Sequence, residues 1–181
     1  VLFLQTINIL TAFGKLIHLK YLEIMFFSPN LSEEFDFCSL ISFLDASPAL
    51  ETFIFRIGTP TIRHDSVVED PFGGSSHPRC FSECCHDNVK NMMITGFCSA
   101  KSMFALVIHI MERTKSLECL TLDTTRGHDR RFPSMDRCWL LNEEALVEAE
   151  KARIAIQWYI EGRVPAAVNL KVIEPCSKCT I

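Results

Sequence analysis

The sequence lacks the long apolar run of about 18 residues that a membrane-spanning helix requires. Its richest run is ALVIHIM at 105–111, which contains His109. The opening stretch is apolar, but four polar residues interrupt it: Gln5, Thr6, Asn8 and Thr11. A signal peptide needs a basic segment followed by an unbroken apolar run. We therefore expect neither a signal peptide nor a membrane partner.

The sequence also has little excess charge of either sign. Its 18 lysines and arginines and 22 acidic residues give a formal net charge of −4. Nucleic-acid-binding proteins usually carry a basic patch or stripe, so we expect no nucleic acid as partner. A hydrophobic fraction of 48% is typical of a folded globular protein. The length of 181 residues is enough for one domain with a sizeable core, so we expect a single domain over 1–181.

Catalytic motifs are missing as well. The sequence contains no phosphate-binding glycine loop, no paired-carboxylate motif and no nucleophile placed beside a base. His128 and Asp129 are adjacent, but neighbours in sequence rarely point at each other, and no serine or cysteine accompanies them. We expect no enzymatic activity, no catalytic residue and no cofactor.

The cysteine count is odd, which argues against a scaffold built on paired disulfides. The nine cysteines lie in apolar segments (Cys38, Cys98, Cys119) as often as in loops. A secreted scaffold would pair them. We expect a reducing compartment, cytoplasm or nucleus, in which the core cysteines act as small hydrophobic residues.

Two cysteine-rich stretches leave a zinc site open as an alternative. They are CFSECCH at 80–86 and CSKC at 176–179. Structural zinc sites usually combine two ligand pairs at tight, recurring spacing, and these two groups lie far apart in the chain. We expect no metal here and free thiols instead. The zinc alternative would draw its ligands from Cys80, Cys84, Cys85, His86, Cys176 and Cys179, with His77 nearby.

What the sequence does contain is a six-residue pattern that recurs five times. The copies begin at Leu19 (LKYLEI), Leu50 (LETFIF), Val89 (VKNMMI), Leu117 (LECLTL) and Leu170 (LKVIEP). Apolar residues occupy positions one, four and six, except that Pro175 occupies position six of the last copy. Alternation at the end of each copy predicts a strand buried on one face.

Helical patterns lie between the copies, over 37–47, 99–115 and 142–162. The first should end before Pro48, and the third has Asn142 as N-cap and Gly162 as its stop. We expect Trp139 and Trp158 to pack against the core. His109 falls on the polar face of its helix, so we expect it at the surface. The predicted buried stripes are Met103, Leu106, Val107 and Ile110 in the second helix, and Leu146, Ala149, Ala152, Ile156 and Tyr159 in the third.

Alternating strands and helices predict an α/β fold, a leucine-rich-repeat-like solenoid with parallel strands on one face and helices on the other. Most spacings between copies exceed the roughly 20–29 residues of regular leucine-rich repeats, so we expect irregular repeats with long insertions. Residues 59–88 carry prolines and glycines with little apolar periodicity. We interpret them as a flexible insertion that follows the second strand.

Strand alternation also predicts where a protein partner binds. Positions three, five and seven of each copy should lie on the open face, away from the helices. This face mixes apolar and polar side chains, which suits a protein better than nucleic acid. The predicted residues are Tyr21, Glu23, Met25, Thr52, Ile54, Arg56, Asn91, Met93, Thr95, Cys119, Thr121 and Asp123.

The loop after the fourth copy, RGHDRR at 126–131, offers a second candidate site. Arginine side chains match carboxylate and phosphate oxygens, so Arg126, Arg130 and Arg131 are candidates for recognition of an acidic partner. The alternative is a solvated loop.

The chain resembles the C-terminal leucine-rich-repeat region of plant F-box/LRR proteins with FBD-like C-termini. The resemblance rests on LIHLKYLEI (16–24), LDASPALETFIFRI (44–57), KNMMITGFCSAKS (90–102), SLECLTLDTTRG (116–127), EALVEAEKARIAI (144–156) and VIEPCSKC (172–179). It implies that the repeats capture a protein substrate for an SCF-type E3 ubiquitin ligase, whose adaptor would bind an F-box that this chain does not show. The alternative is a free-standing repeat scaffold without a ubiquitin role. Because the chain opens at Val1 directly in the pattern, we expect an N-terminally truncated fragment of marginal stability, since an uncapped repeat exposes apolar surface.

Overall fold

The centre of the protein is a six-stranded sheet whose strands follow one another in sequence order. The computed structural model describes residues 2–4, 15–26, 35–58, 64–69, 80, 82–127 and 139–179. All neighbouring strands are parallel. The strands are β1 (Leu2–Leu4), β2 (Tyr21–Phe26), β3 (Thr52–Ile57), β4 (Asn91–Thr95), β5 (Cys119–Asp123) and β6 (Asn169–Ile173).

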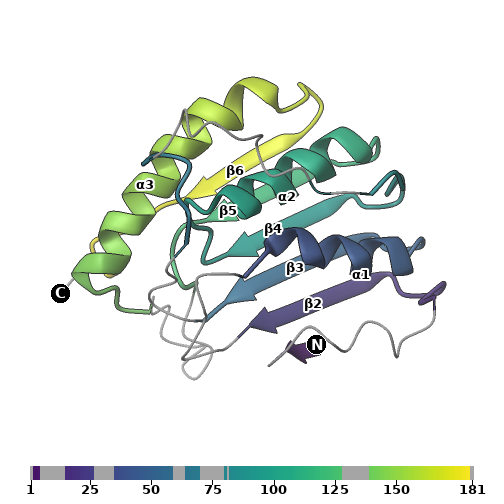
Figure 1. Cartoon of the computed structure of the whole chain (residues 1–181), viewed down its shortest axis with the longest axis horizontal. Helices are drawn as coiled ribbons and strands as arrows, with labels where there is room; N and C mark the ends of the chain where they lie inside the picture. The colour runs from purple at the N-terminus through teal and green to yellow at the C-terminus, as the bar shows by residue number, and fades with distance from the viewer. Residues whose placement is uncertain are drawn as a thin grey trace.

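The described helices all lie on one side of this sheet, as Figure 1 shows for α1, α2 and α3. They are η2 (Phe37–Leu40), α1 (Ile41–Ala46), α2 (Lys101–Arg113), α3 (Glu143–Tyr159) and η3 (Glu161–Arg163). Helices α1, α2 and α3 connect β2 to β3, β4 to β5 and β5 to β6. The predicted α/β architecture of parallel strands with helices on one face is therefore confirmed.

The repeated pattern sets the register of the strands. Position three of the first four copies aligns, so that Tyr21 pairs with Thr52, Thr52 with Asn91, and Asn91 with Cys119. The predicted start of the fifth copy at Leu170 is wrong by three residues, because Leu170 pairs with Leu120 and therefore occupies position four. Positions four and six point toward the helices and are at most 3% exposed in the first four copies: Leu22, Ile24, Phe53, Phe55, Met92, Ile94, Leu120 and Leu122. The alternation that predicted strands buried on one face is confirmed for β2 to β5.

Local signals fix the helix ends. The side chain of Asp36 accepts a hydrogen bond from the Cys38 amide at 2.9 Å, and α1 ends at Ala46, before Pro48. The Asn142 side chain accepts from the Ala145 amide at 3.1 Å and caps α3. The predicted buried stripe of α2 is confirmed, because its four residues are at most 1% exposed. Among the described helices, none is long and apolar enough to cross a membrane.

Two predictions about single side chains are wrong. His109 is only 6% exposed, because the segment around His86 covers this side of α2; the two rings lie 6.1 Å apart, and the His86 amide donates to the Arg113 carbonyl oxygen at 2.9 Å. Trp158 is 61% exposed. It lies on α3, the last of the described α-helices in chain order, and projects into solvent.

The segment over 64–69 is built into the fold, although it belongs to the predicted flexible insertion. Ser66 forms an antiparallel bridge with Ala100, and the Val67 amide donates to the Ser99 carbonyl oxygen at 2.9 Å. Ser66 and Val67 are both buried. The remaining parts of the insertion at 59–63, 70–79 and 81 lie outside the described residues.

Cys38 and Cys80 form a disulfide across 42 positions of sequence. This pairing corrects the interpretation of Cys38 as a small hydrophobic thiol. The expected reducing compartment itself stays a prediction.

Candidate functional site

The open face of the sheet, opposite α1 to α3, is the first candidate site. Because the strands align, its side chains form three rows that run across the strands. The first row begins with Tyr21, the second with Glu23 and the third with Met25. The aligned residues in β3 to β6 are Thr52, Asn91, Cys119 and Asn169; Ile54, Met93, Thr121 and Lys171; and Arg56, Thr95, Asp123 and Ile173.

Exposure divides the predicted binding residues into two groups. Tyr21 is 48% exposed, Asn91 is also exposed, and half-buried side chains surround them: Met25, Thr52, Ile54, Arg56, Met93, Cys119 and Thr121. Glu23, Thr95 and Asp123 are at most 5% exposed. These three lie on the predicted strands at the predicted positions, but they offer a partner almost no surface.

Hydrogen bonds across β2, β3 and β4 link Tyr21, Glu23, Arg56 and Thr95, and we call these four residues the polar chain. Tyr21 donates its hydroxyl hydrogen to Oε2 of Glu23 at 3.0 Å. Arg56 donates from Nε to Oε1 of Glu23 at 2.7 Å and from Nη1 to Oγ1 of Thr95 at 3.1 Å. The ion pair is shielded from water, with side-chain exposures of 20% for Arg56 and 6% for Glu23. Arg56 therefore ties strands together as well as facing outward.

The loop after β5 is also held by hydrogen bonds, which begin at the buried Asp123. Oδ1 of Asp123 accepts from the Thr125 amide at 2.9 Å and from its hydroxyl at 2.6 Å. The Gly127 amide donates to Oγ1 of Thr125 at 2.9 Å. Arg126 is half-buried; burial lowers the pKa of its guanidinium, and its Nε has no hydrogen-bond partner among the described residues. Arg130 and Arg131 lie outside the described residues.

A second candidate site lies on the helix side of the sheet and consists of His64, Cys98 and Glu148, the three-residue cluster. One potential ligand atom from each residue lies within 4.8 Å of the other two. Nε2 of His64 lies 3.1 Å from Oε1 of Glu148, and the Ser99 amide donates to the same oxygen at 2.6 Å. Nδ1 of His64 is buried, and the part of the chain that the structure describes offers it no hydrogen-bond partner.

Electrostatics favour an ion pair inside this cluster. Burial lowers the pKa of His64, but its interactions with Cys98 and Glu148 more than offset this and raise the pKa to about 10. Burial also raises the pKa of Glu148, whereas its hydrogen bonds with His64 and Ser99 give a net lowering. An imidazolium facing a carboxylate in a poorly hydrated site explains both directions.

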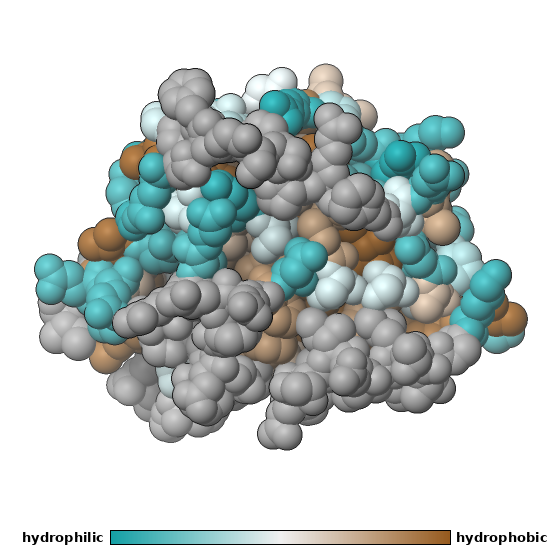
Figure 2. All heavy atoms as spheres, viewed as in Figure 1, coloured by the Kyte–Doolittle hydropathy of each residue, from teal (hydrophilic) through white to brown (hydrophobic). Residues whose placement is uncertain are grey.

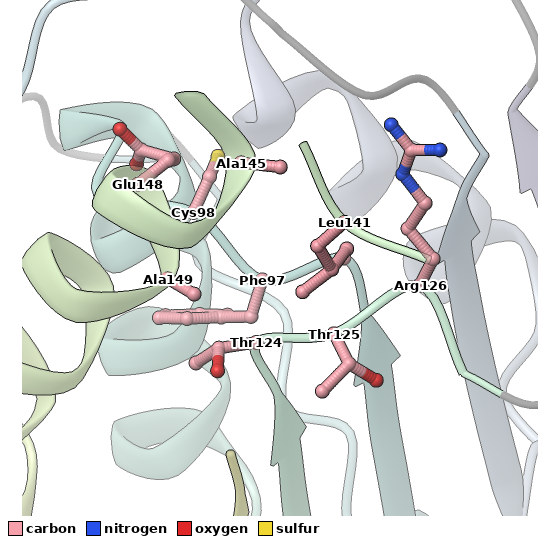
Figure 3. Close-up of a pocket in the computed structure, with 10 residues that line it drawn as sticks. Phe97, Cys98, Thr124, Thr125, Arg126, Leu141, Ala145, Glu148 and Ala149 are labelled. Atoms are coloured by element: carbon pink, nitrogen blue, oxygen red, sulfur yellow. The ribbon is translucent and has the colours of Figure 1, made fainter. Parts of the chain in front are cut away.

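A small pocket of about 40 Å³ adjoins the three-residue cluster. Figure 3 shows Cys98 and Glu148 close together on one side and Arg126 on the opposite side, with its guanidinium directed away from Phe97. Gly96 makes this arrangement possible: its φ is +77°, and a Cβ there would lie 2.7 Å from the Ile57 carbonyl oxygen. The turn at Gly96 directs Cys98 and Ser99 toward α3.

Among the described residues, the cysteine-rich stretches at 80–86 and 176–179 are not brought together as three possible ligands of one ion; His77 lies outside the described residues. Cys80 is bonded to Cys38, and Cys84 and Cys85 are exposed free thiols. His86 is buried; Nε2 lies 3.7 Å from Asp45, which is too long for a hydrogen bond, and burial lowers its pKa. Sγ of Cys176 lies 3.6 Å from Sγ of Cys179. Among the described residues, only the three-residue cluster groups three possible metal ligands.

Sequence reasoning missed His64 and Glu148. Glu148 carried a usable signal, since it stands three residues after Ala145 and four before Ala152, both buried positions of α3. A carboxylate on the inward face of a helix calls for a polar partner. His64 carried none, because it lies in a stretch without periodicity.

Surface hydropathy gives no sign of one dominant apolar area on the helix side. Figure 2 shows hydrophilic and hydrophobic residues interspersed over the described parts of this face. Among the described residues, the large hydrophobic side chains with high exposure are Ile17, Tyr21, Leu140, Val147 and Trp158.

Comparison with known proteins agrees with a repeat of strands and helices. Residues 4–177 match the family described as At1g61320/AtMIF1, LRR domain. A search of curated proteins found no match, and a search of solved structures found none either. Since the match spans nearly the whole chain, this protein belongs to the At1g61320/AtMIF1 family of leucine-rich-repeat domains.

Proposed function

We propose that the chain is a protein–protein interaction module that binds its partner on the open face of the sheet. The observation that carries the proposal is the alignment of the three rows across neighbouring strands. A rigid sheet fixes the relative positions of these side chains, so they can match a complementary surface without being ordered on binding.

The chemistry of the open face supports a protein partner. Half-buried apolar groups such as Met25, Ile54 and Met93 lie beside polar groups such as Thr52 and Thr121, with the exposed Tyr21 at one side of the first row. Interface cores are enriched in tyrosine and methionine and depleted in charged residues. This is also why we propose neither nucleic acid nor a membrane as the partner.

The polar chain refines which residues contact the partner. Glu23 and Thr95 are buried, and each accepts a hydrogen bond from the Arg56 side chain. We propose that the partner contacts the exposed Tyr21 and Asn91 and the half-buried residues of the open face, while the hydrogen bonds of Arg56 with Glu23 and Thr95 keep the strands in place.

Within this function, we propose that the module supplies the substrate-recognition repeats of an SCF-type E3 ubiquitin ligase F-box protein. The support is the resemblance stated for the sequence. In that role the chain catalyses nothing itself, because the ligase complex performs the transfer, and its site of action is the cytoplasm or nucleus. The alternative proposal is a free-standing leucine-rich-repeat scaffold that binds protein without a ubiquitin role.

The test of partner binding compares one open-face variant with one helix-side variant. Asn91→Arg places a long charged side chain in the first row, and Glu112→Arg does the same at an exposed position of α2. Affinity enrichment of the tagged chain, followed by quantitative mass spectrometry, should show partners that are lost in Asn91→Arg and retained in Glu112→Arg. Partners retained by both variants, or lost only in Glu112→Arg, would contradict binding at the open face.

The ligase role needs a separate experiment. The coding sequence upstream of Val1 should be read and the longer polypeptide expressed with the SCF adaptor. We expect the adaptor to co-purify, and Asn91→Arg to abolish ubiquitination of the partner without reducing adaptor binding. A longer polypeptide that binds the partner but not the adaptor would support the free-standing scaffold.

A further inference from the structure

We propose that His64, Cys98 and Glu148 bind a zinc ion on the helix side of the sheet. The three side chains offer nitrogen, sulfur and oxygen, all of which zinc accepts. Their ligand atoms lie within 4.8 Å of one another, whereas zinc would hold such atoms roughly 3.3–3.8 Å apart. Side-chain rotations that move these atoms by about 1 Å would bring all three within bonding distance of one ion.

The backbone around the cluster is already fixed in position. The Ser99 amide holds the Glu148 carboxylate at 2.6 Å, and the hydroxyls of Ser66 and Ser99 lie 2.7 Å apart. The bridge between Ser66 and Ala100 holds the segment that carries His64. Groups that orient metal ligands from outside the coordination sphere raise metal affinity. Here the Ser99 amide orients Glu148, and the bridge at Ser66 positions the segment of His64.

In this proposal the fourth ligand is a water molecule in the pocket beside the cluster. The pocket is lined by Cys98 and Glu148 and has a volume of about 40 Å³, which is sufficient for a water molecule. Three protein ligands and one water complete the tetrahedral set of an open zinc site. Zinc would displace the proton that lies between Nε2 of His64 and Oε1 of Glu148, which are 3.1 Å apart.

A rival use of the same residues is a cysteine nucleophile activated by histidine and glutamate. Cys98 is only 5% exposed, so a peptide or ester substrate cannot reach its sulfur. A metal ion is much smaller than a peptide or ester and can reach the sulfur without an open cleft. The burial of Cys98 therefore favours the metal over the nucleophile.

The ion would join three segments that are far apart in sequence. His64 lies between β3 and β4, Cys98 follows β4, and Glu148 belongs to α3. Because zinc bound only by the folded chain adds its binding free energy to folding, we expect the melting temperature to rise when zinc is added to the chelator-treated 181-residue chain.

The deciding experiment is a titration of the chelator-treated chain with Zn²⁺ and, separately, Co²⁺. We expect one ion per chain, and with Co²⁺ a near-ultraviolet band from a single thiolate. Cys98→Ser should remove the band, and His64→Gln and Glu148→Gln should each weaken zinc binding by about 100-fold, at the upper end of the loss from a supporting group. The matched controls Cys119→Ser and His109→Gln should change neither.

The cysteine pair at 176 and 179 is the main competing ligand source, since its sulfurs lie 3.6 Å apart. The titration is therefore repeated in the variant Cys176→Ser/Cys179→Ser, which also decides the matter if Cys98→Ser fails to fold. A thiolate band that survives in this double variant supports the site. No uptake by the folded double variant, or binding that persists in folded Cys98→Ser, would overturn it.

Discussion

Arg56 on β3 donates a hydrogen bond from Nε to Oε1 of Glu23 on the neighbouring β2, at 2.7 Å, on the sheet face opposite the helices. The carboxylate is buried, and the arginine also reaches Thr95 on β4. One side chain thereby connects three strands that the chain forms in succession. The following predictions test this connection and the other features that position the candidate sites.

Arg56→Ala should lower the free energy of unfolding by about 3 kcal/mol, because it leaves the Glu23 carboxylate buried and without its cation. Tyr21→Phe removes one hydroxyl bond to the same carboxylate and should cost about 1 kcal/mol. Urea denaturation followed by circular dichroism measures both. If Arg56→Ala were as stable as the unmodified chain, the polar chain would have no structural role.

Gly96→Ala should destabilise the protein by about 2 kcal/mol, since alanine disfavours the positive φ and its Cβ would clash with the Ile57 carbonyl oxygen. Gly162→Ala is the matched control. Nothing lies within 4 Å of a Cβ at Gly162, so we expect a change below about 0.5 kcal/mol. Equal unfolding midpoints for the two variants would show that the turn at Gly96 is not constrained.

Acid should destabilise the protein through His86 and His109. Burial lowers the pKa of both histidines below the ordinary value of 6.5, and the charge of Arg113 lowers both further. Nearby carboxylates partly oppose this lowering: Asp45 acts on both histidines, Asp87 on His86 and Glu112 on His109. A lowered folded pKa means that the stabilisation is complete above pH 6.5 and is lost as the pH falls through the folded pKa. Melting temperatures between pH 7.5 and 5, with chelator present, should fall less steeply in His109→Gln. If the melting temperatures of the unmodified chain and of His109→Gln fell equally with pH, His109 would not contribute to the acid sensitivity.

The disulfide should contribute up to about 4 kcal/mol through the loop it closes across 42 residues. Cys38→Ser removes it, and Cys84→Ser removes an exposed free thiol as a control. Peptide mapping without reductant should recover Cys38 linked to Cys80. Recovery of both as alkylated thiols from unreduced protein would show that the bond does not form.

Strands β2 to β5 and the helices were predictable because each is specified by a local pattern, whereas β1 was not predicted and the copy assigned to β6 was three residues out of register. Leu19, Leu50, Val89 and Leu117 mark copies whose alternating residues have one buried side, and parallel pairing in sequence order then sets the register. Asn142 and Pro48 mark helix ends through the backbone groups they satisfy or block. These signals act within a few residues, so they can be read from the chain alone.

The candidate sites were less predictable because they depend on contacts between distant segments. Glu23 was assigned to the correct face, but its burial depends on Arg56, 33 residues away. His109 was assigned to a polar helix face that the segment around His86 covers. The three-residue cluster joins positions separated by 34 and 50 residues, and no local periodicity reports such an encounter.

The disulfide has a topological consequence for the sheet. The covalent ring that Cys38 and Cys80 close contains the whole of β3, which lies between them in sequence. Each strand pairs only with its sequence neighbours in the sheet, so a force that pulls on the two ends of the chain detaches the edge strands first. Such a force can peel β1 from β2 or β6 from β5, but it cannot extend the chain through β3 until the ring is reduced. In an oxidising solution the sheet would therefore lengthen under load in steps, and the step that belongs to β3 would be missing.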